Sequence, residues 1–173
     1  MFALTILGNN SAVPAFGRNP TAQVLQTQDE LFLIDCGEGT QLQLSKYKIR
    51  RSKINHIFIS HLHGDHYFGL IGLLTSMSLL RRTQDLHLHA PPLLQQIIDL
   101  QLQAASTTLN YKVHFHPLTG EGVIANTSKI SVECFQVKHR IDCWGFIFRE
   151  IKNPRSVIPE RAKSYEIPAA FFE

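Results

Sequence analysis

One segment, HIFISHLHGDHYFGLIGLL at 56–74, constrains this chain more than any other. Its first apolar run predicts a buried strand and its second a helix. Between the two runs lie four side chains that can bind a metal: His61, His63, Asp65 and His66. In α/β sheets the point where a strand gives way to a helix is an edge at which ligands bind. We therefore expect this polar cluster at such an edge.

The spacing of these side chains favours a shared metal ion. His61 and His63 are two residues apart, so in extended backbone both project to the same side. Gly64 permits a tight turn, and Asp65 and His66 then follow at the start of the helix. Imidazole and carboxylate suit zinc and related divalent ions. We predict a metal site here; the competing interpretation is a polar turn whose histidines bond only to backbone.

A further ligand has to come from elsewhere, because one cluster seldom completes a catalytic site. His139 is the best candidate, since it follows the alternating run 129–137, precedes the apolar run WGFIF and so lies at a strand end. Taken alone, it could equally be an exposed side chain without function. We expect His56 to be structural. We interpret the other four histidines as surface positions of two strands: His87, His89, His114 and His116.

A second polar feature, in the run LFLIDCGEGTQ at 31–41, is Asp35. It closes a buried strand just before two glycines, which is the form of a turn that holds a carboxylate at a strand end. We predict that Asp35 accepts a hydrogen bond from a metal-bound histidine and so orients its ring. The alternative is an ordinary turn or helix-capping aspartate.

Hydrophobic patterning predicts a layered α/β fold. Runs typical of strands lie at 2–7, 22–26, 31–35, 56–60, 86–89, 112–116, 129–137 and 144–149, and patterns typical of helices lie at 38–47, 68–82 and 92–105. Strands come first and then mix with helices, which favours α/β layers over a bundle or a pure sandwich. The length of 173 residues suits a single domain with a sizeable core.

The composition excludes several other classes of protein. The three cysteines are scattered and form no CxxC pair, so neither a disulfide framework nor a cysteine-rich zinc site is expected. The N-terminal residues do not read as a signal peptide, and no apolar run approaches the ~20 residues of a membrane span. We therefore expect a cytoplasmic protein without a membrane partner. The net charge of +3 permits a polyanionic partner but does not argue for one.

One segment is much more basic than the rest of the chain. SKYKIRRSK, at 45–53, carries five cations just before the strand that leads to the histidines: Lys46, Lys48, Arg50, Arg51 and Lys53. Such a cluster could contact the phosphates of RNA. A solvated connection between a helix and a strand would have the same composition.

Together these motifs resemble the metallo-β-lactamase superfamily and, within it, the ribonuclease Z family of tRNA 3′-processing endonucleases. The histidine segment matches the H-x-H-x-D-H motif of superfamily hydrolases, followed by a G-L-x-G-L-L helix. Two narrower motifs carry the resemblance to ribonuclease Z: DCGEGTQ at 35–41 and HRIDCWGF at 139–146. The segment LGNNSAVPAFGRNP at 7–20 is similar to the family's N-terminal loop.

The resemblance implies a metallo-β-lactamase-like αββα sandwich with two zinc ions in the complete site and no organic cofactor. It assigns His61, His63 and His139 to one zinc, and Asp65 with His66 to the second. Asp65 is also implied as the catalytic proton acceptor. The implied reaction is hydrolysis of a phosphodiester in precursor tRNA, which releases the 3′ trailer, and the implied assembly is a homodimer.

The resemblance covers only the N-terminal half of such an enzyme. The family's later aspartate, in an F-x-G-D-T context, and its final histidine have no counterpart in this sequence. We expect 1–150 to be the N-terminal half of the metallo-β-lactamase-type domain and 151–173 the truncated start of its tRNA-binding arm. The fragment itself is then expected to hold zinc partially or not at all and to be nearly inactive. Two alternatives stay open: a related hydrolase of small esters or cyclic nucleotides, and a non-catalytic binding half.

Overall fold

The computed structural model describes residues 2–13, 15–152 and 158–168. In chain order its strands are β1 (Ala3–Gly8), β2 (Ala22–Gln26), β3 (Leu31–Cys36), β4 (Ile54–Phe58), β5 (Leu86–Ala90), β6 (Val113–Pro117), β7 (Gly122–Asn126), β8 (Ile130–Gln136) and β9 (Trp144–Glu150). Its helices are α1 (Thr40–Lys46), the short 3-10 helix η1 (Arg51–Lys53), α2 (Gly64–Tyr67), α3 (Leu70–Leu79), α4 (Leu93–Ala104) and α5 (Pro159–Ser164).

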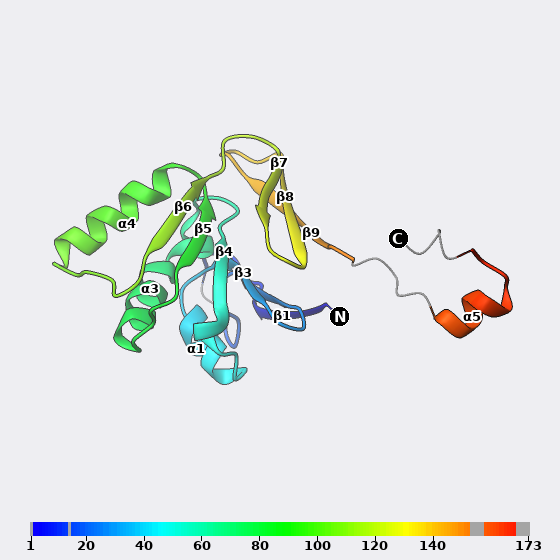
Figure 1. The fold of residues 1–173 in the computed structure, drawn as a ribbon. Coiled ribbons are helices and arrows are strands. Elements are labelled where there is room, and N and C mark those ends of the chain that lie inside the picture. Colours follow the sequence, from blue (N-terminus) through cyan, green and yellow to red (C-terminus); the bar gives the residue numbers. More distant parts are fainter. Residues whose placement is uncertain (1, 14, 153–157, 169–173) are drawn as a thin grey trace.

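The strands form a six-stranded sheet in the order β1-β2-β3-β4-β5-β6 and a three-stranded sheet in the order β7-β8-β9 (Figure 1). In the larger sheet β1, β2 and β3 pair antiparallel, whereas β3 to β6 run parallel. Helices connect the parallel strands, as such crossovers require. The C-terminal ends of the parallel strands consequently meet at one edge, which brings together the segments that follow β3 and β4.

Helices α1, α3 and α4 cover one face of the six-stranded sheet. Leu33 of β3 and Ile57 of β4 share a buried cluster with Leu44 of α1, Leu73 of α3 and Leu94 of α4. All five side chains are fully buried. Burying such a side chain contributes roughly 1.5–3 kcal/mol relative to exposure, so this cluster holds the helical layer in place.

The three-stranded sheet packs on the opposite face, as Figure 1 shows for β7–β9. Phe32 and Phe58 of the large sheet cluster there with Ile130 and Val132 of β8. Phe148 of β9 lies edge-on to Phe58, with ring centroids 5.4 Å apart. The layers are therefore helix, sheet and sheet, and the predicted α/β class is confirmed.

Several elements differ from the sequence prediction. The helix predicted at 68–82 is α3 at 70–79, with the short helix α2 before it at 64–67, and the strand predicted at 56–60 is β4 at 54–58. Strand β7 was not predicted, because its five residues show no alternation and pairing with β8 defines it. No helix within the described part of the chain combines the length and apolar character needed to cross a membrane.

The division of the chain at residue 150 stays a prediction. Strand β9 ends at Glu150. Of the segment 151–173, in which we expected the start of an RNA-binding arm, only 151–152 and 158–168 lie within the described residues. They include α5, which was not predicted and which lies apart from both sheets in Figure 1.

A row of stacked histidines crosses β4, β5 and β6. His56 stacks on His87 with ring centroids 4.8 Å apart, and His89 stacks on Phe58 at 4.6 Å and on His116 at 4.5 Å. His89 is only 1% exposed, so the prediction that it is a surface position is wrong. Strand pairing sets His89 opposite both Phe58 and His116, which places its ring over the interior face of the sheet. The sequence could not reveal this, because alternation marks a face without saying what covers it.

This row makes the stability of the fold pH-dependent. Burial, with the nearby His116 and His56, lowers the pKa of His89 from 6.5 to about 3, so the ring stays neutral in the folded protein. In the unfolded chain it binds a proton below pH 6.5, so acidification stabilises the unfolded state until the pH reaches about 3. His89 alone then lowers the free energy of unfolding by about 2 kcal/mol between pH 7 and pH 5.

We predict that the free energy of unfolding of His89→Phe falls less between pH 7 and pH 5 than that of the unmodified chain. The variant keeps a ring on Phe58 and carries no titrating group at this position. Urea unfolding at pH 7 and pH 5 measures the difference. Gln103→Ala, at an exposed position of α4 that carries no titrating group, is the control and keeps the pH dependence of the unmodified chain. An equal loss of stability in the unmodified chain and in His89→Phe would refute the assignment.

Candidate metal centre

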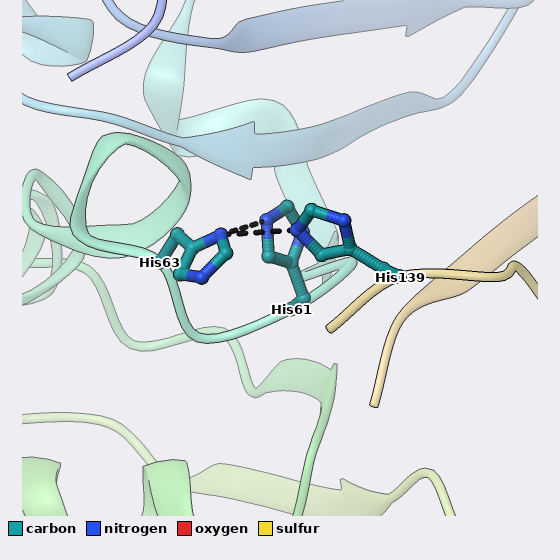
Figure 2. A group of neighbouring side chains, drawn as sticks. All are labelled: His61, His63 and His139. Atoms are coloured by element: carbon teal, nitrogen blue, oxygen red, sulfur yellow. Dashed lines mark hydrogen bonds between the residues drawn. The ribbon is translucent and has the colours of Figure 1, made fainter. Parts of the chain in front are cut away.

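Three imidazoles converge at the C-terminal end of β4 (Figure 2). His61 and His63 follow β4, and His139 reaches them from the loop between β8 and β9. The Nε2 atom of His61 lies 3.0 Å from Nδ1 of His63, and Nε2 of His139 lies 3.2 Å from the same atom. One ligand atom from each of the three residues falls within 4.8 Å of the other two. Residues far apart in the sequence therefore form one compact donor set.

The spacing of these nitrogens fits a divalent metal. Zinc binds imidazole nitrogen at 2.0–2.1 Å, so tetrahedral ligand nitrogens lie about 3.3 Å apart. The observed 3.0 and 3.2 Å are close to this value. Arg140 Nε donates to Nε2 of His63 at 3.0 Å, which leaves the proton of a neutral His63 on Nδ1. Binding a cation through Nδ1 therefore requires that the Arg140 contact open.

The electrostatics also suit a metal, which binds neutral imidazole. Burial and the adjacent His66 lower the pKa of His61 from 6.5 to about 4, although Asp35 opposes this shift. Burial, followed by the charge of Arg140, lowers the pKa of His63. Both rings are consequently neutral at physiological pH, as metal ligands have to be.

A hydrogen-bonded network centred on Asp35 orients the histidine rings. The buried Asp35 accepts hydrogen bonds at Oδ1 from the Ser60 N–H (2.8 Å) and Oγ (2.9 Å), and at Oδ2 from Nδ1 of His66 (2.8 Å). Ser60 Oγ, which donates to Asp35, lies 3.0 Å from Nδ1 of His61 and can accept its proton. This leaves Nε2 of His61 as the lone-pair atom that faces the cluster.

His66 and Asp65 lie beside the three imidazoles. The ring centroid of His66 is 3.9 Å from that of His61, and its Nε2 lies 3.6 Å from Oδ2 of Asp65. Burial lowers the pKa of His66, but its hydrogen bond to Asp35 and the charges of Asp35 and Asp65 outweigh burial and raise that pKa overall. The structure thus gathers all six residues singled out at this end of the sheet, and their separate roles stay a prediction.

The basic residues of 45–53 do not lie at this site. They precede β4, whereas His61 follows it, so the two groups occupy opposite ends of that strand. Sequence reasoning also missed three residues that touch the cluster. Ser60 and Arg140 are described above, and Cys143 Sγ lies 3.7 Å from Nδ1 of His61. A signal existed, because each directly precedes a predicted ligand or lies within the HRIDC motif.

Two glycines let the loops of the site pack closely. The N–H of Gly69 donates to the carbonyl of Cys36 at 2.9 Å, and a Cβ on Gly69 would collide with the carbonyl of Gly37. A Cβ on Gly37 would collide with the backbone oxygen of Asp65 and lie 2.6 Å from Cβ of Pro20. The loop after β3 therefore lies directly against the loop that carries the histidines.

A protein-family model described as Anti-Pycsar protein Apyc1 matches residues 2–155. The chain belongs to this family. The match covers both sheets and every residue of the candidate metal centre.

The chain is also similar to proteins named ribonuclease Z. It is 43% identical over 169 residues to a ribonuclease Z of Bacteroides fragilis, which covers 96% of this chain and 56% of that protein. It is 45% identical over 172 residues to a ribonuclease Z of Cytophaga hutchinsonii, covering 96% and 55%. The predicted resemblance is confirmed. The chain spans about half the length of these curated relatives.

Solved structures confirm the predicted metallo-β-lactamase fold. The short form of human tRNase Z superposes with a TM-score of 0.78 at 32% identity, covering 87% of this chain and 65% of that one. The metallo-β-lactamase fold protein YhfI of Bacillus subtilis superposes with a TM-score of 0.65 at 18% identity, covering 86% and 57%. The second likeness supports the fold alone.

We predict that Gly37→Ala destabilises the chain by about 1–3 kcal/mol, because the new methyl group meets backbone that cannot yield without moving the histidine loop. Urea unfolding measures the effect. Gly120→Ala is the matched control, since a Cβ there has no heavy atom within 4 Å, and it should change stability by no more than about 0.5 kcal/mol. Equal stabilities of the two variants would show that the close approach at Gly37 is unimportant.

Proposed function

We propose that this chain is the N-terminal part of a zinc-dependent endoribonuclease that cleaves the 3′ trailer from precursor tRNA. The observation that carries the proposal is the convergence of His61, His63 and His139 within 4.8 Å. The similarity to ribonuclease Z supports the substrate. A homodimer that acts in the cytoplasm, implied by the resemblance, is part of the same proposal.

The residues of the site have distinct roles in this proposal. His61, His63 and His139 would hold one zinc, and His66 with Asp65 would contribute to a second. Zinc, when bound, acts as a Lewis acid that polarises phosphate oxygens and acidifies water. Asp65, at the rim of the cluster, accepts the proton of the attacking water. Asp35 holds His66 through its Nδ1–H, which directs the other ring nitrogen towards Asp65.

The donor set of this chain is smaller than that of the complete enzyme. Its sequence contains no F-x-G-D-T motif, in which the resemblance places the carboxylate that bridges two ions. We therefore propose that this chain alone holds zinc weakly and hydrolyses RNA poorly, while the complete protein holds two ions.

A second candidate function is hydrolysis of a small phosphodiester, such as a cyclic nucleotide. It stays a candidate because the matching family model is described as Anti-Pycsar protein Apyc1 and not as ribonuclease Z. The same donor set would serve both reactions. The two functions differ in the substrate that the protein prefers.

Zinc binding tests the site. We expect His63→Ala to weaken zinc binding by the chain 1–173 at least tenfold, because it removes the imidazole between the other two. Equilibrium dialysis at pH 7.5 measures the affinity. His114→Ala, which removes a half-exposed histidine bound to Asp85, should leave zinc binding unchanged. Equal losses of zinc affinity in both variants would contradict the site. Two tightly held zinc ions per unmodified chain would contradict the proposal that the site of this chain is incomplete.

Substrate preference tests the reaction. We expect the longer protein that contains this chain to cleave precursor tRNA well and bis(p-nitrophenyl) phosphate poorly. Asp65→Asn should lower kcat by roughly 10²–10⁴-fold, since it removes the proton acceptor. The control Asp99→Asn changes an exposed carboxylate on α4 and should keep full activity. Turnover of the small ester alone would favour the second candidate.

A further inference from the structure

We infer that a basic groove at the end of the sheet opposite the histidines binds RNA phosphates away from the point of cleavage. The groove encloses about 640 Å³. We call it the arginine groove. Five cations line it: Arg50, Arg51, Lys53, Arg81 and Arg82. RNA as its ligand rests on the proposed function.

The structure divides the basic segment predicted from the sequence. Lys48 lies in a neighbouring hollow that Asp29 and Glu30 also line, and Arg50 and Lys53 border that hollow too. Lys46 lies over the ring of Tyr47, 5.9 Å from its centroid. Together with Arg51, Arg50 and Lys53 also meet two further arginines from the turn after α3. The lining of this second hollow holds cations and no carboxylate.

No acidic residue lines the arginine groove. Within the described residues, no carboxylate forms an ion pair with Arg50, Lys53 or Arg81, all of which are exposed. Arg51 donates to the Ser45 hydroxyl at 2.8 Å, which positions its guanidinium without neutralising it. Like charges held this close repel one another, and a polyanion relieves that repulsion.

The hydrogen bonds of Arg82 hold the walls of the groove together. Arg82 is only 6% exposed, and its Nη1 donates to the carbonyl of Ile54 at 3.0 Å, while Nε and Nη2 donate to those of Gln84 and Asp85 at 2.7 Å. These bonds tie the start of β4 to the turn after α3. They hold the exposed cations of both segments on one surface, so the groove exists before any ligand binds.

The position of the groove defines which phosphates it meets. Lys53 immediately precedes β4 and His61 lies beyond its far end. The five residues of β4, at roughly 3.3 Å per residue, keep the two groups roughly 16 Å apart. A phosphate at the histidines cannot reach the groove, so the groove contacts the RNA several nucleotides away. Such contacts position the nucleic acid without reading its sequence.

Salt dependence of RNA binding tests the inference. The triple variant Arg50→Gln, Arg51→Gln, Arg81→Gln should bind a fluorescent precursor tRNA at least tenfold more weakly than the unmodified chain at 100 mM salt. Each lost phosphate contact lowers the slope of log K against log salt by about 0.7–0.9, so the triple variant loses about two units. Fluorescence anisotropy from 50 to 300 mM salt measures both quantities.

The matched control is Lys46→Gln, Lys48→Gln, Lys112→Gln, which removes the same charge from outside the groove and should keep most of the slope. Equal losses in the two triple variants would overturn the inference. Arg81→Gln alone, expected to lower the slope by about one unit, tests the groove if the triple variant unfolds.

Comparing RNA binding by this chain with RNA cleavage by the longer protein separates this inference from the proposed function. If the groove variants lower the salt slope of RNA binding but the longer protein does not cleave precursor tRNA, the groove is supported and the proposed function is refuted. If the longer protein cleaves precursor tRNA but the groove variants leave the slope unchanged, the proposed function is supported and the groove is refuted.

Discussion

The parallel pairing of β3 with β4 is the constraint on which the rest of this structure depends. It sets Leu33 beside Ile57 and Ile34 beside Phe58, so both strands deliver their next residues to the same edge. Asp35 then meets Ser60, whose N–H and hydroxyl both donate to it. A one-residue change of register would turn every side chain of β4 to the opposite face and separate the carboxylate from the histidine loop.

Because Asp35 is fixed in this way, it can support groups that come from three segments. It holds His66 directly and His61 through Ser60. Its backbone is left-handed, with φ of 56°, a conformation that aspartate tolerates better than most residues and that here aims its carboxylate at α2. The smaller sheet adds the third segment, since the turn between β8 and β9 brings His139 to the same place. The centre is thus a product of strand order more than of local sequence.

The two ends of β4 carry two different groups of side chains. Its C-terminal end leads to neutral imidazoles that suit a metal, and its N-terminal end follows a run of cations. The five residues of the same strand hold the two features at its opposite ends, roughly 16 Å apart. Arg81 and Arg82, which lie far from 45–53 in the sequence, are the true neighbours of Arg51.

The sequence by itself determined the fold class and singled out the histidine segment as a candidate metal site, because apolar periodicity and the H-x-H-x-D-H spacing are local properties that act within one strand and one turn. It also singled out Asp35 from its place at the end of a buried run. Only the tertiary structure decided that His139 joins His61, that His89 is buried under a stack of rings, and that Arg50 lines a groove with Arg81. Each of these depends on which elements pack face to face, and side-chain alternation along one strand carries no information about what lies opposite.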